Sequence, residues 1–177
     1  ILLDYGLQKL SEIQAKGITS ILQFQDTIIH SQAGSGKSVL YAISILQMID
    51  PSIQQLQALI LSPTRYVVSR DYKLLLKLGE SMNISIASCT TKPGSVENLE
   101  EIKAQIIIGT VSGVKEMRNK DLVQLGKVRL LVLDEADEFF GRGLEADLRC
   151  LTKLLVDETQ IIVSTCTLPE EVKKYTE

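Results

Sequence analysis

The chain has 177 residues, of which 45% are hydrophobic and 23% are charged, and its formal net charge at pH 7 is −3. This length allows one domain with a full core, and the composition excludes wholesale disorder. The charge balance argues against a histone-like or polybasic protein. No apolar run approaches the roughly 18 residues of a membrane span, so we expect no membrane partner. Because the chain opens at Ile1 without a methionine, we expect it to be part of a longer protein.

Short β-rich runs alternate with longer helical stretches. The predicted strands are Thr27–His30, Ala58–Ser62, Ile84–Ser88, Ile106–Gly109, Leu130–Leu133 and Ile161–Ser164. The predicted helices are Lys9–Leu22, Lys37–Met48, Arg65–Leu78, Val111–Arg118, Leu144–Val156 and one that begins at Pro169. Most strand runs are continuous in Ile, Val and Leu, which is typical of parallel strands covered on both faces. The alternation therefore predicts an α/β fold, with a mostly parallel central sheet flanked by helices on both faces.

The cysteines of the chain are few and widely spaced. They are Cys89, Cys150 and Cys166. An odd number at such spacing does not suit a disulfide framework, so we expect reduced thiols packed in the core. Reduced thiols are typical of a cytoplasmic protein, with the nucleus as the alternative location.

A glycine-rich loop follows the first predicted strand and precedes a helix. It reads Ser31-Gln32-Ala33-Gly34-Ser35-Gly36-Lys37-Ser38. Its glycines let backbone N–H groups turn toward phosphates, Lys37 can reach the terminal phosphates, and the Ser38 hydroxyl can ligate Mg²⁺. Ser31 stands where the general phosphate-loop pattern has glycine. The strand–loop–helix context nevertheless predicts a nucleotide phosphate site.

The fifth predicted strand ends in a cluster of acidic residues, Asp134-Glu135-Ala136-Asp137. An acidic residue at this place is what an Mg²⁺-binding Walker-B site requires. Asp134 is predicted to hold the metal through water, and Glu135 to orient or deprotonate the attacking water. The alternative is an acidic helix start that favours the helix dipole. The phosphate loop favours the metal site over this alternative.

The four residues from Asp134 to Asp137 spell the signature of the DEAD-box RNA helicases, and other motifs follow in the family's order. Ser11-Glu12-Ile13-Gln14 resembles the Q motif and Ser31–Ser38 resembles motif I. Ser62-Pro63-Thr64-Arg65 resembles motif Ia, Gly109-Thr110 the start of motif Ib, and Thr165-Cys166-Thr167-Leu168-Pro169 motif III. The runs Tyr41–Arg65 and Val128–Phe139 are most similar to the translation initiation factor 4A branch, and the mRNA-export branch is also similar.

The resemblance implies a role for each matching residue. Gln14 is expected to hydrogen-bond the adenine of ATP. The residues expected to hold the phosphates are Gln32, Ala33, Gly34, Ser35, Gly36, Lys37 and Ser38. Ser38 and Asp134 are the expected Mg²⁺ ligands, and the expected catalytic residues are Glu135, Lys37 and Asp134. The expected RNA contacts are Pro63, Thr64, Arg65, Gly109 and Thr110, and the residues expected to couple the two sites are Asp137, Thr165 and Thr167.

The resemblance also implies the domain organisation. Residues 1–177 are expected to form a single RecA-like, P-loop NTPase domain, the first of two in a helicase core. The second RecA-like domain of the same protein is expected to bring the arginine fingers and the other half of the RNA cleft, so this domain alone should hydrolyse ATP poorly. RNA is expected to bind through its backbone without regard to sequence. Protein cofactors are further expected partners.

The motifs for RNA depart from the family pattern more than those for ATP. Motif Ia continues with Tyr66-Val67 where Glu-Leu is expected, and motif Ib lacks its proline and arginine. Losing an arginine–phosphate contact removes one affinity term. Two hypotheses stay open: an ATP-dependent RNA helicase or RNA-clamping ATPase, and a degenerate domain that serves as a protein- or RNA-binding scaffold in a ribonucleoprotein assembly. A small-molecule kinase is disfavoured, because no stretch supplies a lid and an acceptor site.

Overall fold

The computed structural model describes residues 9–90 and 103–176. Their strands form one six-stranded sheet in the order β1-β6-β5-β2-β4-β3, and every neighbouring pair is parallel. The strands are β1 (Thr27–His30), β2 (Ala58–Leu61), β3 (Ile86–Cys89), β4 (Ile106–Gly109), β5 (Leu130–Leu133) and β6 (Gln160–Thr165). The helices are α1 (Glu12–Leu22), α2 (Lys37–Met48), α3 (Arg65–Gly79), α4 (Val111–Asn119), α5 (Ala136–Gly141), α6 (Glu145–Thr152) and α7 (Glu170–Thr176), with a 3-10 turn η1 at Leu125–Lys127.

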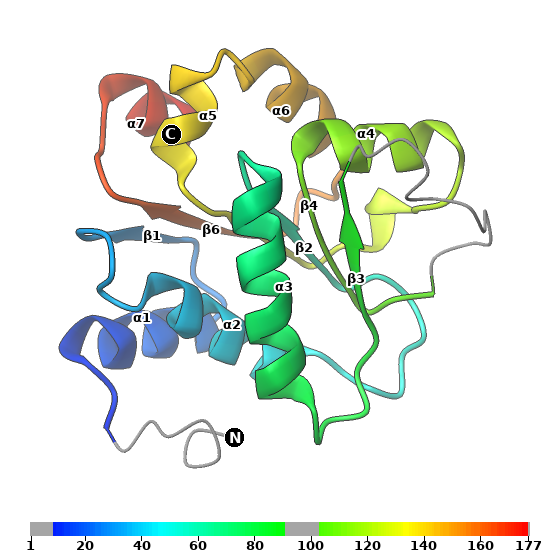
Figure 1. Cartoon of the computed structure of the whole chain (residues 1–177), viewed down its shortest axis with the longest axis horizontal. Helices are drawn as coiled ribbons and strands as arrows, with labels where there is room; N and C mark the ends of the chain where they lie inside the picture. The colour runs from blue at the N-terminus through cyan, green and yellow to red at the C-terminus, as the bar shows by residue number, and fades with distance from the viewer. Residues whose placement is uncertain (1–8, 91–102, 177) are drawn as a thin grey trace.

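Helices cover both faces of the sheet, as Figure 1 shows. Successive residues of a strand point to opposite faces, so Leu59 and Leu61 of β2 join one apolar cluster while Ala58 and Ile60 join another. The first cluster includes side chains from α4, α5, α6 and α7, and the second includes side chains from α1, α2 and α3. The predicted parallel sheet with helices on both faces is therefore confirmed.

Helix and strand ends differ from the predicted ones for local reasons. The first helix begins at Glu12 instead of Lys9, because Ser11 caps it: Ser11 Oγ accepts from Gln14 N (3.4 Å) and Ser11 N donates to Gln14 Oε1 (2.9 Å). The helix predicted over Leu144–Val156 is shorter, at Glu145–Thr152, and the third strand is Ile86–Cys89 instead of Ile84–Ser88. Helix α5 and the turn η1 were not predicted, since both are too short to show a helical period.

The thiols are free, but they do not all lie in the core. Cys89 is buried, and this burial raises the pKa of its thiol to about 12. Cys166 is partly buried and Cys150 is exposed on α6. The prediction of core thiols is therefore wrong for Cys150, which lies on the solvent side of a short amphipathic helix. No helix in the described part of the chain is long and apolar enough to cross a membrane.

Candidate functional site

The predicted functional residues meet at one edge of the sheet. Because all strand pairs are parallel, the carboxyl ends of the strands lie together, and we call this the carboxyl edge. The phosphate loop leaves β1, motif III leaves β6 and the acidic cluster leaves β5, and these strands are neighbours. Motifs Ia and Ib leave β2 and β4, which are the next two strands along the sheet. Strand order thus places the residues predicted to bind nucleotide beside those predicted to bind RNA.

Glycines shape the phosphate loop. Gly34 and Gly36 have φ values of +79° and +90°, a backbone region that other residues rarely adopt. A Cβ at Gly36 would also lie 2.4 Å from Gln14 Nε2. Gln14 Nε2 donates to Gly36 O (3.3 Å), so the structure brings the predicted adenine-binding residue against the phosphate loop. Its contact with adenine remains a prediction.

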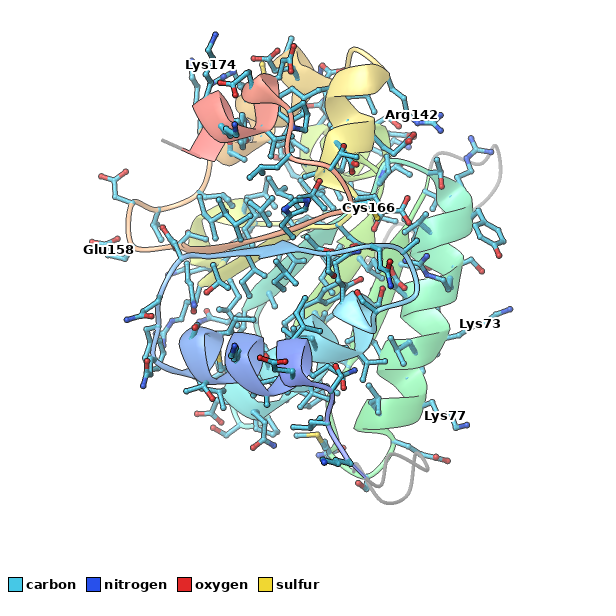
Figure 2. The ribbon with its side chains drawn as sticks, turned by 90° about the vertical axis from the view of Figure 1, so that its left-hand side faces the viewer. Lys73, Lys77, Arg142, Glu158, Cys166 and Lys174 are labelled. Atoms are coloured by element: carbon cyan, nitrogen blue, oxygen red, sulfur yellow. The ribbon has the colours of Figure 1, made fainter. Side chains whose placement is uncertain are left out.

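Lys37 turns its ammonium group into the phosphate loop. Nζ donates to Ser31 O (2.5 Å) and Gln32 O (3.0 Å), and it lies 3.3 Å from Cys166 Sγ. Figure 2 shows Cys166 at the carboxyl end of β6. A buried ammonium group needs such acceptors, and phosphate oxygens can replace the carbonyls. Lys37, Ser38, Asp134 and Glu135 together line a cavity of about 500 Å³ at the carboxyl edge.

Asp134 is buried at the end of β5. Its Oδ1 accepts from Ser164 Oγ (2.7 Å), and its Oδ2 accepts from Arg70 Nη2 (3.1 Å). Burial, and after it the nearby carboxylate of Asp71, raise the pKa of Asp134 to about 7, although the hydrogen bond from Ser164 and the charge of Arg70 act in the opposite direction. Additional positive charge stabilises the ionised form of a buried carboxylate whose pKa is raised, and a bound cation would supply that charge.

Glu135 has an unusual backbone conformation. Its φ of 52° and ψ of 51° lie in the left-handed region, where a residue with a Cβ costs about 1–3 kcal/mol. This turn ends β5 and starts α5, and it brings the Glu135 carboxylate to the cavity wall, where Oε1 accepts from Arg70 Nη1 (3.3 Å). Strain of this kind is typical of functional sites.

The residues predicted to bind RNA lie at the starts of two helices. Thr64 caps α3, with its Oγ1 accepting from Val67 N (3.3 Å), and Thr110 caps α4, with its Oγ1 accepting from Gly113 N (3.1 Å). Pro63 and Arg65 adjoin Thr64, and Arg65 is exposed. Gly109 ends β4 beside β2, since Ser62 N donates to Gly109 O (3.0 Å). The two helix starts therefore lie next to each other.

The three residues predicted to couple the sites are in contact. Thr167 donates to Asp137 Oδ2 from its backbone N (2.9 Å) and from Oγ1 (2.7 Å). Thr165 Oγ1 donates to Thr167 O (2.5 Å). Partial burial acts to raise the pKa of Asp137, but the hydrogen bonds from Thr167 and Thr165 together hold that pKa below its usual value. The start of α5 is thus tied to the end of β6.

Sequence comparison agrees with this arrangement. A family model for DEAD/DEAH box helicases matches residues 11–175. The chain belongs to the DEAD/DEAH box helicase family. It is 35% identical over 174 residues to an ATP-dependent RNA helicase eIF4A of Mycosarcoma maydis, with 97% of this chain and 42% of that protein covered. Its identity to the Neurospora crassa protein of the same name is 33% over 177 residues, covering 97% and 44%.

Structural comparison confirms the RecA-like domain of DEAD-box helicases. S. cerevisiae Dbp5 bound to RNA and ADP BeF3 matches with a TM-score of 0.88 and 27% identity, over 99% of this chain and 45% of that one. A variant of Dbp5 bound to a variant of Gle1 and IP6 matches with a TM-score of 0.91 and 28% identity, over 99% and 45%. The helicase chain described here spans less than half the length of these relatives.

The site of this helicase domain contains an ion-pair network that the sequence analysis missed. Arg70 Nε donates to Asp71 Oδ1 (2.7 Å) and Nη2 donates to Asp71 Oδ2 (3.0 Å), while Tyr41 Oη donates to Asp71 Oδ2 (2.8 Å). The sequence contained one indication of this network. Asp71 shares the buried stripe of α3 with Val67, Val68, Leu75 and Leu78, and a charged residue in an apolar stripe indicates a buried partner.

The donors at this site fit magnesium. Within residues 9–90 and 103–176, no group of three or more His, Cys, Asp or Glu side chains could hold a metal by itself. Mg²⁺ prefers oxygen ligands and usually keeps several waters and phosphate oxygens, so it needs few protein ligands. Ser38 Oγ and Asp134 Oδ2 both lie within 3.2 Å of Arg70 Nη2, so a hydroxyl and a carboxylate already converge on one positive group.

Proposed function

We propose that this chain is the ATP-binding domain of an ATP-dependent RNA helicase or RNA-clamping ATPase. The observation that carries the proposal is one cavity lined by Lys37 and Ser38 of the phosphate loop and by Asp134 and Glu135 of the acidic cluster. The names of the eIF4A relatives support the same activity. Because the chain covers less than half of those relatives, the activity belongs to a longer protein that contains it.

The motif residues in and beside the cavity then have tasks in ATP binding and hydrolysis. Lys37 exchanges the loop carbonyls for the terminal phosphates, and Gln14 hydrogen-bonds the adenine. Ser38 and Asp134 would hold Mg²⁺, which would neutralise charge on the phosphate oxygens. Glu135 orients the attacking water and takes its proton. An arginine finger from a second RecA-like domain of the same protein completes the site.

RNA binds along the adjoining part of the carboxyl edge. Pro63, Thr64, Arg65, Gly109 and Thr110 contact its backbone, where the N–H groups that begin α3 and α4 can hold phosphates. The solved complex of the similar Dbp5 with RNA and ADP BeF3 supports RNA as a partner. Asp137, Thr165 and Thr167 transmit the nucleotide state, because they tie the acidic cluster to motif III. Residues 1–177 act as one domain, in the cytoplasm or the nucleus.

A second candidate function is a scaffold in a ribonucleoprotein assembly. Tyr66, which replaces the expected glutamate of motif Ia, is 78% exposed at the start of α3. Dbp5 has been solved with Gle1 and with Nup159, which supports protein cofactors as partners of the longer protein. A pure scaffold, however, does not need an ATP site with Lys37, Asp134 and Glu135 in one cavity.

The two functions differ in ATP turnover by the longest protein that carries this chain. We expect single-stranded RNA to stimulate hydrolysis, and Glu135→Gln to abolish the stimulated rate by about a hundredfold or more, because the water loses its general base. Glu138→Gln is the matched control, since Glu138 pairs with Arg142 on the exposed side of α5. Turnover that is equal in wild type and Glu135→Gln, with or without RNA, would leave the scaffold as the better account.

A further inference from the structure

Arg70 of α3 lies where the metal of the nucleotide site is expected. Its Nη2 donates to Ser38 Oγ (3.2 Å) and Asp134 Oδ2 (3.1 Å), and its Nη1 donates to Glu135 Oε1 (3.3 Å). These are the hydroxyl and the carboxylates assigned above to the metal and the attacking water. One guanidinium group already supplies positive charge to all of them.

The guanidinium is held in this position from behind. Nε and Nη2 form the paired hydrogen bonds of a fork with the two oxygens of Asp71, whose side chain is 1% exposed. Moving Arg70 away would remove two charged hydrogen bonds from the buried Asp71 carboxylate and leave it the hydrogen bond from Tyr41 Oη, and a buried carboxylate without a cationic partner is costly. The side chain of Arg70 is itself 43% exposed and lines the cavity. It is therefore fixed to the protein on one side and open to ligands on the other.

Arg70 and Mg²⁺ cannot occupy this position together. Mg²⁺ requires near-octahedral oxygen ligands at about 2.0–2.1 Å and retains several waters. A nitrogen about 3 Å from both Ser38 Oγ and Asp134 Oδ2 takes up the space of the ion and its waters. The two cations also repel each other inside a site of low dielectric constant.

We propose that Arg70 is a built-in cation of the nucleotide site that competes with Mg²⁺ for Ser38, Asp134 and Glu135. The inference rests on the proposed nucleotide-binding function. Because part of the metal's binding energy is used to displace Arg70, Mg²⁺ strengthens nucleotide binding less than it otherwise would. A neutral residue at position 70 removes this competition.

The coupling can be measured without catalysis. A fluorescent ADP analogue is titrated into the purified protein in excess EDTA and again in millimolar Mg²⁺. The dissociation constant in EDTA divided by the dissociation constant in Mg²⁺ gives the factor by which the metal strengthens binding. We expect Arg70→Gln to increase this ratio by about 5-fold to 150-fold, the usual range for coupled sites. Arg142→Gln, which removes an exposed arginine paired with Glu138, should leave the ratio at the wild-type value.

A second variant keeps the test informative if Arg70→Gln fails to fold because it leaves Asp71 buried without its cationic partner. Arg70→Gln/Asp71→Asn removes both charges of the buried pair, and circular dichroism checks that each protein is folded. A ratio in the folded variants that equals or falls below that of wild type overturns the inference. Absence of ADP binding in all proteins, with and without Mg²⁺, would instead contradict the proposed nucleotide site, and the inference would fall with it.

Discussion

The amide group of Gln14 is held from both sides. Its Oε1 accepts from Ser11 N (2.9 Å) and its Nε2 donates to Gly36 O (3.3 Å). One side chain therefore links the start of α1 to the phosphate loop. If an adenine base binds beside the loop, this amide can offer it both a donor and an acceptor.

Replacing Gln14 should remove the preference for adenine. We expect Gln14→Ala to weaken ADP binding by about 5-fold to 100-fold, the effect of one buried hydrogen-bond pair, and to leave the weaker GDP binding nearly unchanged. Competition of ADP and GDP with a fluorescent nucleotide measures both affinities. Gln54→Ala is the control, because Gln54 is an exposed residue that bonds Pro51 O in the turn before β2. Equal losses for ADP and GDP would show that Gln14 does not read the base.

Some residue contacts could not be predicted from one sequence. Lys37, Ser38, Asp134 and Glu135 were predicted together, because each belongs to a local motif whose chemistry is known. Arg70 belongs to no such motif in this chain, and its partners Ser38 and Asp134 are far from it in sequence. Which distant side chains meet depends on the order of the strands, which spacing alone does not fix.

At the level of single elements, β4 ends at a position with no room for a side chain. A Cβ on Gly109 would lie 2.6 Å from Cys89 O and 2.8 Å from Val114 Cγ2, between β3 and α4. Cys89 O also accepts from Thr110 N (3.0 Å), so the neighbouring strand is held in place. The close approach of these backbones brings the start of α4 to the carboxyl edge.

Gly109→Ala should therefore destabilise the domain. Overpacking at such a site costs about 1–3 kcal/mol, measured as the free energy of unfolding in a denaturant titration. Gly126→Ala in η1 is the control, because a Cβ there meets nothing within 4 Å, and its unfolding free energy should stay near wild type. An unchanged unfolding free energy in Gly109→Ala would contradict this expectation, because it would mean that β3 and α4 can move apart to admit a methyl group without loss of stability.

The elements themselves were predictable where their sequence pattern was long. All six strands and the helices α1, α2, α3, α4, α6 and α7 were predicted at nearly the observed places. Helix α5 was missed because it is only six residues long and starts from the strained turn at Glu135. Asp137 and Glu138 lie in its first turn, so the acidic helix start that was weighed as the alternative to a metal site is present in the structure.

Across the whole molecule, the order of the strands places the proposed nucleotide site next to the proposed RNA site. The order β1-β6-β5-β2-β4-β3 places the loops that line the proposed nucleotide cavity beside the starts of α3 and α4. Alternating strands and helices predicted a parallel sheet, but not which strands neighbour one another, since that depends on long-range pairing. Contacts between motif III and the acidic cluster lie between these regions, where coupling is expected.

The most direct test of the account is equilibrium binding of ADP and ATP to the purified chain, wild type against Lys37→Ala. Lys37 is the one side chain whose ammonium lies inside the phosphate loop among the described residues, bonded to Ser31 O and Gln32 O. We predict saturable binding to wild type and a loss of about tenfold to a hundredfold in Lys37→Ala, because a charged hydrogen bond to phosphate is removed. Equal binding by the two folded proteins, or none by wild type, would contradict a nucleotide site at the carboxyl edge.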